Sequence, residues 1–514
     1  MNSHSRIILL GAGPGNIQIA LQFQEVGIKN SEYLMLEKGT SVATSFKKFP
    51  IHNLLISNNK VINEEDRLRE KLERYDWNSL LTKNKENLFS DYSRDFYPHK
   101  KHMVKMLNDL VINNDLPVQY GTSCKEVFHD GDFFYIVTNL GIFTCEYLVC
   151  GTGLVPKRAP IQGIELTTPY YKMKEKKYYS GKRVLIIGKG NSGLECAKEI
   201  MNEASYISCA SPTQINFAYK THYVGNVRLI NAVQIENYLL KQNASILDCN
   251  ISKIVEDQKG KVVTIHYTHA NGEVENLYFD EIIDATGFQS EKGCLKNFEL
   301  EYHQKNKFPM LDKNFESITV PNLFFSGAQT HGIDYKKTSG GFVHGFRYHS
   351  IILGNYLARK ISSKVTQPFV RGDINQFIID KFENSSGLFL QPGSLIHVVE
   401  KGQNTWIDLG LRTQKWFQEY SSSYIVLGIS LEYGDIQGHN DILKVSRYPG
   451  QPDLSDHLHP ILRKKVGEEI FILNLEENLF NEFDNDINRN RIEHFIASKN
   501  KFNNETCENS HVTI

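Results

Sequence analysis

The sequence lacks an excess of charge of either sign. Its 58 lysine and arginine residues nearly balance 59 aspartate and glutamate residues, so the formal net charge is −1 at pH 7. Proteins that bind nucleic acid or an anionic membrane through a broad surface usually carry a clear positive excess. We therefore expect neither partner, and a small molecule as the substrate.

Long apolar runs are also missing. No stretch of the 514 residues is long and apolar enough to predict a membrane-spanning helix. The first residues, MNSHSRIILL, contain no basic segment, long apolar segment or small-residue cleavage site of the kind found in secretory signal peptides. The prediction is a cytoplasmic protein without a membrane span.

The cysteines do not form the local pairs that bind metals or carry out redox chemistry. Eight are scattered along the chain, and no two have the spacing of a Cys-x-x-Cys motif. This argues against a disulfide framework, a zinc centre and an internal redox dithiol. We expect no metal and, for most of these residues, inert core thiols. They are Cys124, Cys145, Cys150, Cys196, Cys209, Cys249, Cys294 and Cys507.

A glycine turn near the N-terminus, ILLGAGPGN at 8–16, predicts a dinucleotide-binding motif. It lies between an apolar strand-like run at 7–10 and a segment with helical periodicity at 17–26. Gly11 permits a tight turn, and Gly13 lets the backbone approach a pyrophosphate at the positive end of the helix. The third glycine position of the common motif holds Asn16, where helix and strand normally pack closely.

The next apolar strand ends in Glu37, about where this fold places an acid that hydrogen-bonds a ribose hydroxyl. We assign this first motif to FAD. Its predicted cofactor-binding residues are Gly11, Gly13, Pro14, Gly15, Asn16, Glu37 and Lys38.

Residues 181–200, GKRVLIIGKGNSGLECAKEI, repeat the strand, turn and helix with all three glycines in place. Each motif is followed by an apolar strand that ends in a Thr-Gly turn, YLVCGTG at 147–153 and EIIDATGF at 281–288. Because the second motif is inserted after the first closing turn, we assign it to NAD(P)H. Its predicted residues are Gly188, Gly190, Asn191, Ser192, Gly193, Ser211, Thr286 and Gly287.

The choice of nicotinamide cofactor depends on the loop SPTQ at 211–214. It offers hydroxyl groups, but neither the acid that selects NADH nor the arginine that selects NADPH. Because the acid is missing, we expect NADPH, with NADH as the alternative. Lys220 or Arg228 would supply positive charge if the loop folds back.

A third signal lies between residues 320 and 360. An apolar strand ends in Gly327, and the turn Ser339-Gly340-Gly341 precedes a long helix. A helix whose N-terminus faces a flavin would stabilise negative charge on the reduced ring. We therefore add Gly327, Ser339 and Gly340 to the predicted FAD site.

Several longer strings resemble one flavoprotein family. They are RYDWNSLL, LFSDYSRDFYPHKKHMVKML, THYVGNVRLIN, IDYKKTSGGFVHGFRY, LEYGDIQGHNDILKVSR and LHPILRKK. Together they resemble the endoplasmic reticulum flavoprotein associated with degradation and its bacterial homologues, over the chain up to about residue 465. SGKRVLIIGKGNSG and DATGF are similar to the flavin-containing and N-hydroxylating monooxygenases. This chain lacks the signal peptide and the C-terminal retention sequence of the reticulum protein, so we expect it elsewhere.

These strings also supply the candidate catalytic residues. In the monooxygenases that the chain resembles, the segment with Trp77 and Asn78 covers the flavin; the alternative is an ordinary capped helix start. His222 and Arg228 follow the second turn at the distance expected for a nicotinamide or a carboxylate substrate, which Arg228 would clamp. Lys337 lies just before the third turn. We expect it to contact cofactor phosphate or substrate there; the alternative is a solvated charge without a role in binding.

The leading hypothesis is an FAD-dependent monooxygenase that uses NADPH and O2 to hydroxylate a small nucleophilic substrate, an amine. The alternatives are a reductase or oxidase that passes electrons to a protein or thiol acceptor, and a flavin-bearing scaffold protein. The predicted fold is α/β with two dinucleotide-binding Rossmann-like domains and a small C-terminal α+β extension. The predicted boundaries are 1–165 with 283–365 for FAD, 166–282 for NAD(P)H, 366–475 for the extension, and 476–514 for a polar tail without regular structure.

Overall fold

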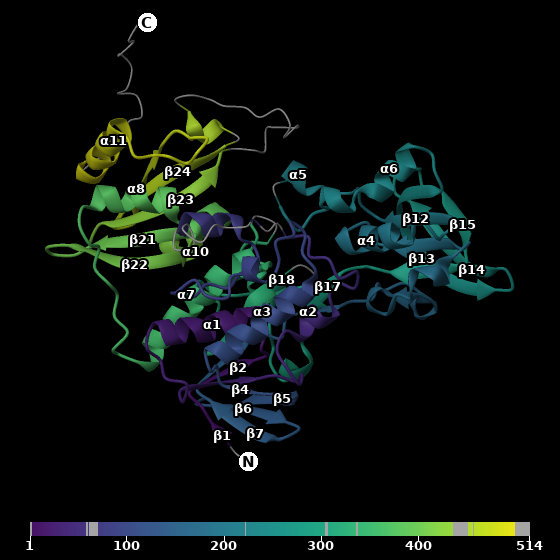
Figure 1. Ribbon diagram of the computed structural model, residues 1–514, viewed down its shortest axis with the longest axis horizontal. Coiled ribbons are helices and arrows are strands. Elements are labelled where there is room, and N and C mark those ends of the chain that lie inside the picture. The colour runs from purple at the N-terminus through teal and green to yellow at the C-terminus, as the bar shows by residue number, and fades with distance from the viewer. Residues whose placement is uncertain are drawn as a thin grey trace, which may run out of the picture. The chain divides into compact units, whose positions relative to one another are not determined.

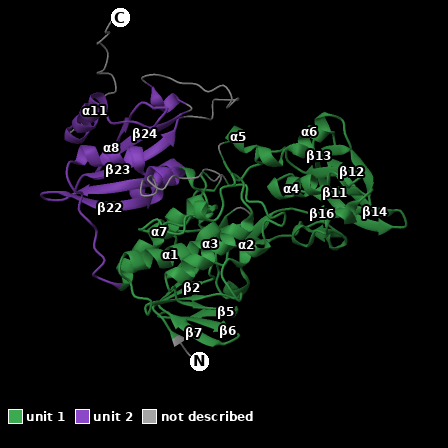
Figure 2. Ribbon diagram, in the orientation of Figure 1, with its two compact units in different colours: residues 1–63, 75–361 green, residues 64–74, 362–514 purple. Residues whose placement is uncertain are grey.

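A computed structural model describes residues 3–57, 60, 70–221, 223–303, 307–335, 338–434, 451–455 and 457–498. The chain divides into two compact units (Figure 2). Unit 1 contains Met1–Asn63 and Tyr75–Ile361, and unit 2 contains Glu64–Arg74 and Ser362–Ile514.

The first glycine turn belongs to a five-stranded parallel sheet in unit 1. The central strand, β2, has four consecutive buried apolar residues, the pattern expected where both faces of a sheet are covered. Helices α1, α3 and α7 lie on one side, and a second sheet formed by β1, β7, β6 and β5 lies on the other (Figure 1). In spatial order the parallel strands are β20 (Leu323–Phe325), β8 (Tyr147–Cys150), β2 (Ile7–Leu10), β3 (Tyr33–Leu36) and β4 (Val118–Gln119).

The remaining elements around this sheet are short apart from three helices. The helices are α1 (Pro14–Glu25), α3 (Lys100–Asn113) and α7 (Val343–Ile361), with the shorter α2 (Thr44–Lys48). The covering sheet consists of β1 (Ser3–His4), β7 (Gly141–Cys145), β6 (Phe134–Thr138) and β5 (Cys124–His129). Two short antiparallel pairs join β9 (Leu154–Pro156) to β17 (Phe288–Ser290) and β18 (Tyr302–His303) to β19 (Phe308–Pro309).

The second glycine turn belongs to a seven-stranded sheet, also in unit 1. Its order is β10 (Thr168–Pro169), β16 (Glu281–Asp284), β11 (Arg183–Ile187), β12 (Tyr206–Ser211), β13 (Ala244–Asp257), β14 (Gly260–Tyr267) and β15 (Val274–Phe279). The pairings from β10 to β13 are parallel and the last two are antiparallel. Helices α4 (Asn191–Ile200), α5 (Ala218–Thr221) and α6 (Val233–Leu239) belong to this part of the chain. The predicted α/β fold with two Rossmann-like motifs is confirmed.

Unit 2 is built on a five-stranded antiparallel sheet with helices, as expected for an α+β extension. The strand order is β22 (Trp406–Thr413), β21 (Leu395–Lys401), β23 (Val426–Tyr433), β24 (Leu458–Val466) and β25 (Glu469–Asn474). Its helices are α8 (Ile374–Asn384), α9 (Ser386–Leu390), α10 (Gln414–Glu419) and α11 (Asp486–Ala497).

Two features of unit 2 differ from the sequence prediction. Part of it comes from residues 64–74, where Arg74 donates a hydrogen bond to the Phe382 carbonyl oxygen at 2.9 Å. The tail expected to lack structure contains α11, because Ile492 and Phe495 are fully buried and Asn485 caps the helix. Two buried apolar residues in twelve give little visible periodicity, so this helix was missed. The division of unit 1 into FAD and NAD(P)H domains stays a prediction.

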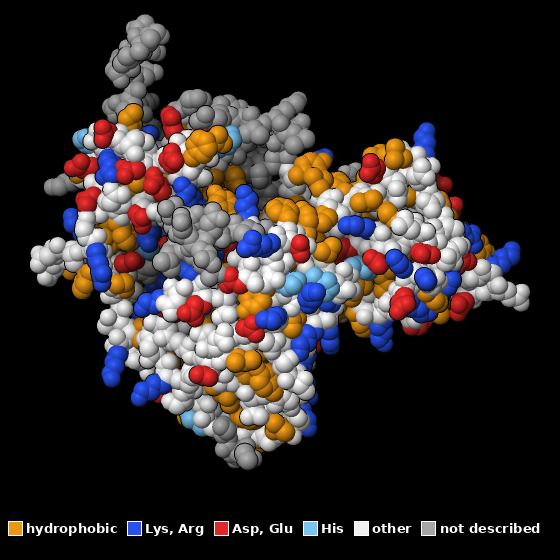
Figure 3. Space-filling view, in the orientation of Figure 1, with side chains coloured by type: hydrophobic (Ala, Val, Ile, Leu, Met, Phe, Trp, Pro, Cys, Tyr) orange, Lys and Arg blue, Asp and Glu red, His pale blue; other side chains and the backbone are white. Residues whose placement is uncertain are grey.

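The distribution of charged side chains on the surface agrees with the balanced charge of the sequence. On the face shown in Figure 3, basic and acidic side chains are interspersed. Over the part of the chain that the structure describes, no helix combines the length and the apolar character needed to cross a membrane.

Candidate functional site

The first glycine turn leaves space at the N-terminus of α1. Gly11 has a left-handed φ of +93°, and a Cβ there would lie 2.9 Å from the Gly151 carbonyl oxygen. Gly13 is the N-cap of α1, with Pro14 in its first turn. A Cβ on Gly13 would meet only the Gly151 oxygen, at 3.9 Å, among the described atoms. We call this space the first cradle; it fits an anion held by the helix N-terminus.

Gly15 and Asn16 together provide the close packing of helix and strand for which the common motif uses a third glycine. A Cβ on Gly15 would lie 2.5 Å from the Gly327 backbone nitrogen, so Gly15 allows α1 to approach the end of β20. Asn16 is 1% exposed and donates hydrogen bonds to the carbonyl oxygens of Leu10 and Gly11, at 3.1 and 2.7 Å. Its side-chain oxygen accepts a hydrogen bond of 2.5 Å from Ser326. Asn16 therefore joins the ends of β2 and β20.

We expect Asn16→Ala to lower the free energy of unfolding by about 2 kcal/mol, because buried partners lose their hydrogen bonds. The matched control is Gln22→Ala, on the same helix, whose half-buried side chain makes one hydrogen bond to Asn355; its cost should stay below about 1 kcal/mol. Urea unfolding measures both. Equal losses in the two variants would contradict the bridging role of Asn16.

Glu37 supports the same turn from the end of β3. It is 4% exposed, and its carboxylate accepts hydrogen bonds from the Ala12 and Gly39 amides at 2.8 and 2.7 Å and from the Thr44 hydroxyl at 2.8 Å. The carboxylate thus holds the loop beside the first cradle, while its predicted contact with a ribose stays a prediction. Lys38, the next residue, is exposed.

Three side chains of unit 1 have buried polar atoms without a partner in the part of the chain that the structure describes. Within the described residues, no hydrogen-bond partner is found for Thr152 Oγ1, for Asn78 Nδ2 or for either side-chain polar atom of Gln329. Thr152 belongs to the closing turn beside Gly11, and Gln329 follows Gly327. These groups include both donors and acceptors, as a flavin nucleotide would require.

The second glycine turn has the same form with all three glycine roles in place. Gly188 has a φ of +123°, and a Cβ there would lie 2.4 Å from the Ala285 carbonyl oxygen. A Cβ on Gly193 would lie 2.1 Å from the Gly188 carbonyl oxygen, so this glycine allows α4 to pack closely on the turn. Gly190 is the N-cap of α4, and no described atom lies within 4 Å of where its Cβ would be. We call this space the second cradle.

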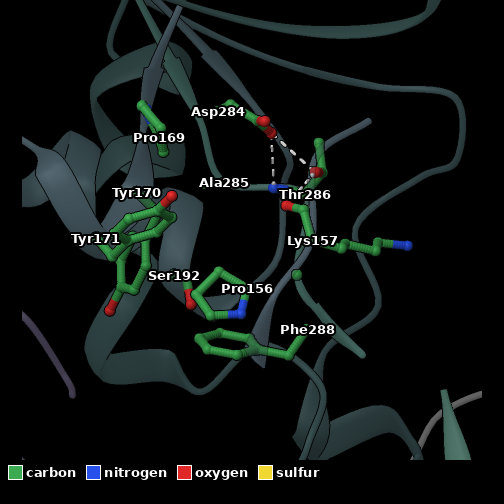
Figure 4. A pocket seen from close by; sticks show the side chains of 11 residues that line it. Pro156, Lys157, Pro169, Tyr170, Tyr171, Ser192, Asp284, Ala285, Thr286 and Phe288 are labelled. Carbon is green, nitrogen blue, oxygen red and sulfur yellow. Dashed lines mark hydrogen bonds between the residues drawn. The ribbon is translucent and has the colours of Figure 1, made fainter. Parts of the chain in front are cut away.

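A pocket opens next to the second cradle (Figure 4). Ser192 reaches it from α4, and Thr286 and Gly287 reach it from the turn after β16. Asp284, which pairs with Arg158 at 2.8 Å, accepts a hydrogen bond of 2.8 Å from the Thr286 hydroxyl. The pocket lies at the carboxyl end of β16, beside β11, where the strand order reverses and such folds bind nucleotides. The rest of the lining is Pro156, Lys157, Pro169, Tyr170, Tyr171, Ala285 and Phe288.

The other predicted residues of the second motif lie outside this lining. Ser211 ends β12, and its hydroxyl hydrogen-bonds to the Thr213 carbonyl oxygen at 3.1 Å. Asn191 instead anchors the loop after α5, by donating to the Asn226 carbonyl oxygen at 2.9 Å and accepting from the Arg228 amide at 3.0 Å. The loop that carries Arg228 is therefore fixed to the start of α4.

Arg228 and Trp77 come together, as two of the predicted catalytic residues. The Arg228 guanidinium lies 5.5 Å from the centre of the Trp77 ring, and burial lowers the pKa of Arg228. Trp77 also stacks on His344 at 4.2 Å between ring centres. His344 is buried, which lowers the pKa of its imidazole well below the usual value. The three side chains form one layer, in which a guanidinium cation lies beside two stacked aromatic rings.

Asn78 lies beside this layer in a turn rather than at a helix start. Its amide and that of Ser79 donate to the Asp76 carboxylate at 3.0 and 2.9 Å, as the first amides of a capped helix would. No helix follows, so the alternative reading of a capped helix is wrong. The buried side chain of Arg347 donates to the Ser79 carbonyl oxygen and fixes the turn.

A buried group, whose members the sequence does not mark as neighbours, links the two glycine motifs. The Tyr223 hydroxyl lies 2.9 Å from His331 Nε2, and His331 Nδ1 lies 3.3 Å from an Asp334 oxygen. Tyr223 comes from the loop anchored by Asn191, whereas His331 and Asp334 follow β20. The pattern was hidden because the partners are more than 100 positions apart in the chain.

The third predicted turn packs around this group. A Cβ on Gly340 would lie 2.6 Å from an Asp334 oxygen and 2.8 Å from His349 Cε1, which leaves room only for glycine. Ser339 is buried in the same turn. Burial lowers the pKa of His349 to about 4, and its Nδ1 lies 2.9 Å from the Thr330 hydroxyl. Gly327, whose φ is +63°, is the first residue of the segment 327–333, which carries His331. His222 and Lys337 lie outside the described residues.

Comparison with known families gives one match that spans most of the chain. Residues 8–327 match the family described as pyridine nucleotide-disulphide oxidoreductase. The FAD-dependent oxidoreductase domain-containing protein 2 of Mus musculus is 28% identical over 441 residues, which cover 78% of this chain and 65% of the mouse protein. The alignment therefore leaves about a third of that relative unmatched.

Solved structures show the same fold at low sequence identity. The bacillithiol disulfide reductase Bdr from Staphylococcus aureus has a TM-score of 0.54 at 18% identity. A flavin-containing monooxygenase from Stenotrophomonas maltophilia has a TM-score of 0.51 at 15% identity. Each covers 70% of this chain and 100% of its own. The likeness includes both reductases and monooxygenases, so it concerns the fold alone.

Proposed function

The chain belongs to the pyridine nucleotide-disulphide oxidoreductase family, and from this we propose that it is an oxidoreductase that binds FAD in the first cradle and NADPH in the second. The observation that carries the proposal is the pair of cradles itself. Each has an N-cap glycine with free space in front of it, at the start of a helix of ten or more residues. The helix N-terminus and its amides favour a phosphate at both places.

In this proposal the chain's own groups hold the two dinucleotides. Gly13 lets the backbone approach the FAD pyrophosphate, in a turn that Gly11 and Gly15 allow to pack closely. Thr152 and Gln329 supply hydrogen-bonding atoms that have no partner among the described residues. Ser192, Thr286 and Gly287 line the NADPH pocket. FAD, when bound, accepts two electrons from the nicotinamide and passes them to an acceptor.

The acceptor we propose is O2, with an amine as the substrate that is hydroxylated. The layer of Arg228, Trp77 and His344 supports this, because aromatic rings exclude water and a guanidinium binds a substrate carboxylate. Asn78, His222 and Lys337 stay proposed members of the same site. The resemblance to the endoplasmic reticulum flavoprotein associated with degradation and to the monooxygenases is the further support.

A single experiment separates oxygenation from electron transfer alone. The protein is reduced with NADPH in a stopped-flow instrument without oxygen and then mixed with oxygen. We expect a transient absorbance that differs from both oxidised and reduced flavin. Immediate return of the oxidised spectrum would contradict the monooxygenase and leave a reductase or an oxidase.

A reductase with a disulfide acceptor is the second candidate, since the bacilliredoxin reductase Bdr of Bacillus subtilis is 20% identical over 70% of this chain and 98% of its own length. NADPH consumption without oxygen, on addition of a low-molecular-weight disulfide, would favour this candidate. A protein that binds no FAD would instead favour a scaffold.

A further inference from the structure

Two cysteines that are far apart in the sequence lie side by side in unit 1. Cys124 begins β5, and Cys294 lies in the short helix η8 (Gly293–Leu295), which packs against β5. Asn297 donates to the Val127 carbonyl oxygen at 3.1 Å and Lys296 pairs with Glu126 at 3.1 Å, so the segment with Cys294 runs alongside the start of β5. There the two thiol groups interact directly, and Cys124 Sγ also lies 3.7 Å from the Glu126 carbonyl oxygen. Both are free thiols. The fold therefore brings together two cysteines that do not belong to a Cys-x-x-Cys motif.

The surroundings of this pair differ from those of the other described cysteines. Cys124 is partly exposed and Cys294 is 8% exposed, so the pair lies near the surface. Five others, Cys145, Cys150, Cys196, Cys209 and Cys249, are fully buried at 0% exposure. An oxidant from solution meets Cys124 first, beside which Cys294 keeps a small exposed fraction, whereas it must open the core to reach these five.

One thiol of the pair is prepared for reaction. The interaction with Cys124 lowers the pKa of Cys294; burial and the charge of Glu291 oppose this change, and the positive charge of Lys38 supports it. The same interaction and burial raise the pKa of Cys124. Burial raises the pKa of Cys145 and of Cys196. Since the thiolate is the nucleophile, Cys294 should react first.

We propose that Cys124 and Cys294 are a redox modification site, which a peroxide oxidises to a disulfide. The Cys294 thiolate attacks one oxygen of hydrogen peroxide, the O–O bond breaks, and a sulfenic acid and hydroxide form. The Cys124 sulfur then attacks the Cys294 sulfur, the S–S bond forms, and water leaves with the proton of Cys124. In total, two thiols lose two electrons and two protons, and one peroxide becomes two water molecules. A low-molecular-weight thiol reverses the reaction by exchange.

Cys150 is an alternative disulfide partner for Cys294. It is buried at the end of β8, directly before the closing turn of the first motif, and it interacts electrostatically with both members of the pair. Among the described residues, no group of three or more His, Cys, Asp or Glu side chains is arranged to hold a metal ion. Because Cys124 has the largest influence on Cys294, we expect it to be the partner.

The test is peptide mapping of the purified full chain. After hydrogen peroxide treatment and blocking of free thiols, digestion without a reductant should give one linked peptide that contains Cys124 and Cys294, lighter than the two reduced peptides by two hydrogen atoms. Dithiothreitol should abolish it. Cys294→Ser should remove it, whereas Cys249→Ser, a change at a buried thiol outside the pair, should leave it unchanged.

Two results would overturn the proposal. The first is peroxide treatment that oxidises methionine but leaves both thiols open to alkylation. The second is a link from Cys294 to Cys150 in place of Cys124. Far-ultraviolet circular dichroism of each variant checks that the fold is kept. The test reads neither flavin nor enzyme activity, so its outcome does not depend on the proposed function.

Discussion

A Gly13→Val variant is expected to fold but to be purified without flavin. The backbone at Gly13 has φ −88° and ψ 172°, which valine adopts readily. The added side chain would meet little of the protein, because among the described atoms only the Gly151 oxygen lies near, at 3.9 Å from the Cβ position. It would instead fill the first cradle. We expect the ratio of FAD to protein to fall more than about tenfold, which corresponds to about 1.4 kcal/mol in binding.

A matched variant separates loss of the cofactor from loss of the fold. Gly11→Val places a Cβ 2.9 Å from the Gly151 oxygen at a φ of +93°, so it should disrupt the turn and lower the yield of folded protein. Gly13→Val should keep the far-ultraviolet circular dichroism and thermal midpoint of the protein without FAD. Retention of full flavin by Gly13→Val would contradict the assignment of the first cradle.

The reciprocal variant, Gly190→Val, should stay yellow but lose reduction by NADPH. Gly190 has φ −86° and ψ −175°, and no described atom lies within 4 Å of its Cβ position, so the fold tolerates valine. The side chain would occupy the second cradle, where the NADPH pyrophosphate is proposed to bind. We expect the apparent Kd for NADPH, from the rate of flavin reduction without oxygen, to rise more than about tenfold.

The two variants together test the order of the sites. The proposal requires Gly13→Val to lose flavin and Gly190→Val to keep it. The opposite result, with full flavin in Gly13→Val and none in Gly190→Val, would show that the two assignments are inverted.

The two glycine motifs could be predicted from sequence because their signals are local. Each needs a strand, a turn and a helix within about twenty residues, and the turn demands glycine wherever φ is positive or a backbone passes close by. Gly11, Gly188 and Gly193 all meet these demands in the structure. The adaptation at Asn16 could not be predicted, because its partner Ser326 lies 310 positions away.

The rest of the site depends on contacts that sequence patterns do not encode. Tyr223 meets His331 across 108 positions, and Cys124 meets Cys294 across an even longer separation. Neither pair has a spacing that marks it, since the fold alone brings its members together. The helix of residues 486–497 was missed for a different reason: its buried face, Asn488, Ile492 and Phe495, includes a polar residue, so the apolar periodicity in the sequence is weak.

The flavin content of the purified, unmodified protein tests the central claim most directly. FAD and protein are quantified in the same sample, before and after incubation with added FAD, and NADPH is then added without oxygen. The account predicts a yellow protein with close to one FAD per chain, which NADPH bleaches. A folded but colourless protein that added FAD cannot reconstitute would contradict it.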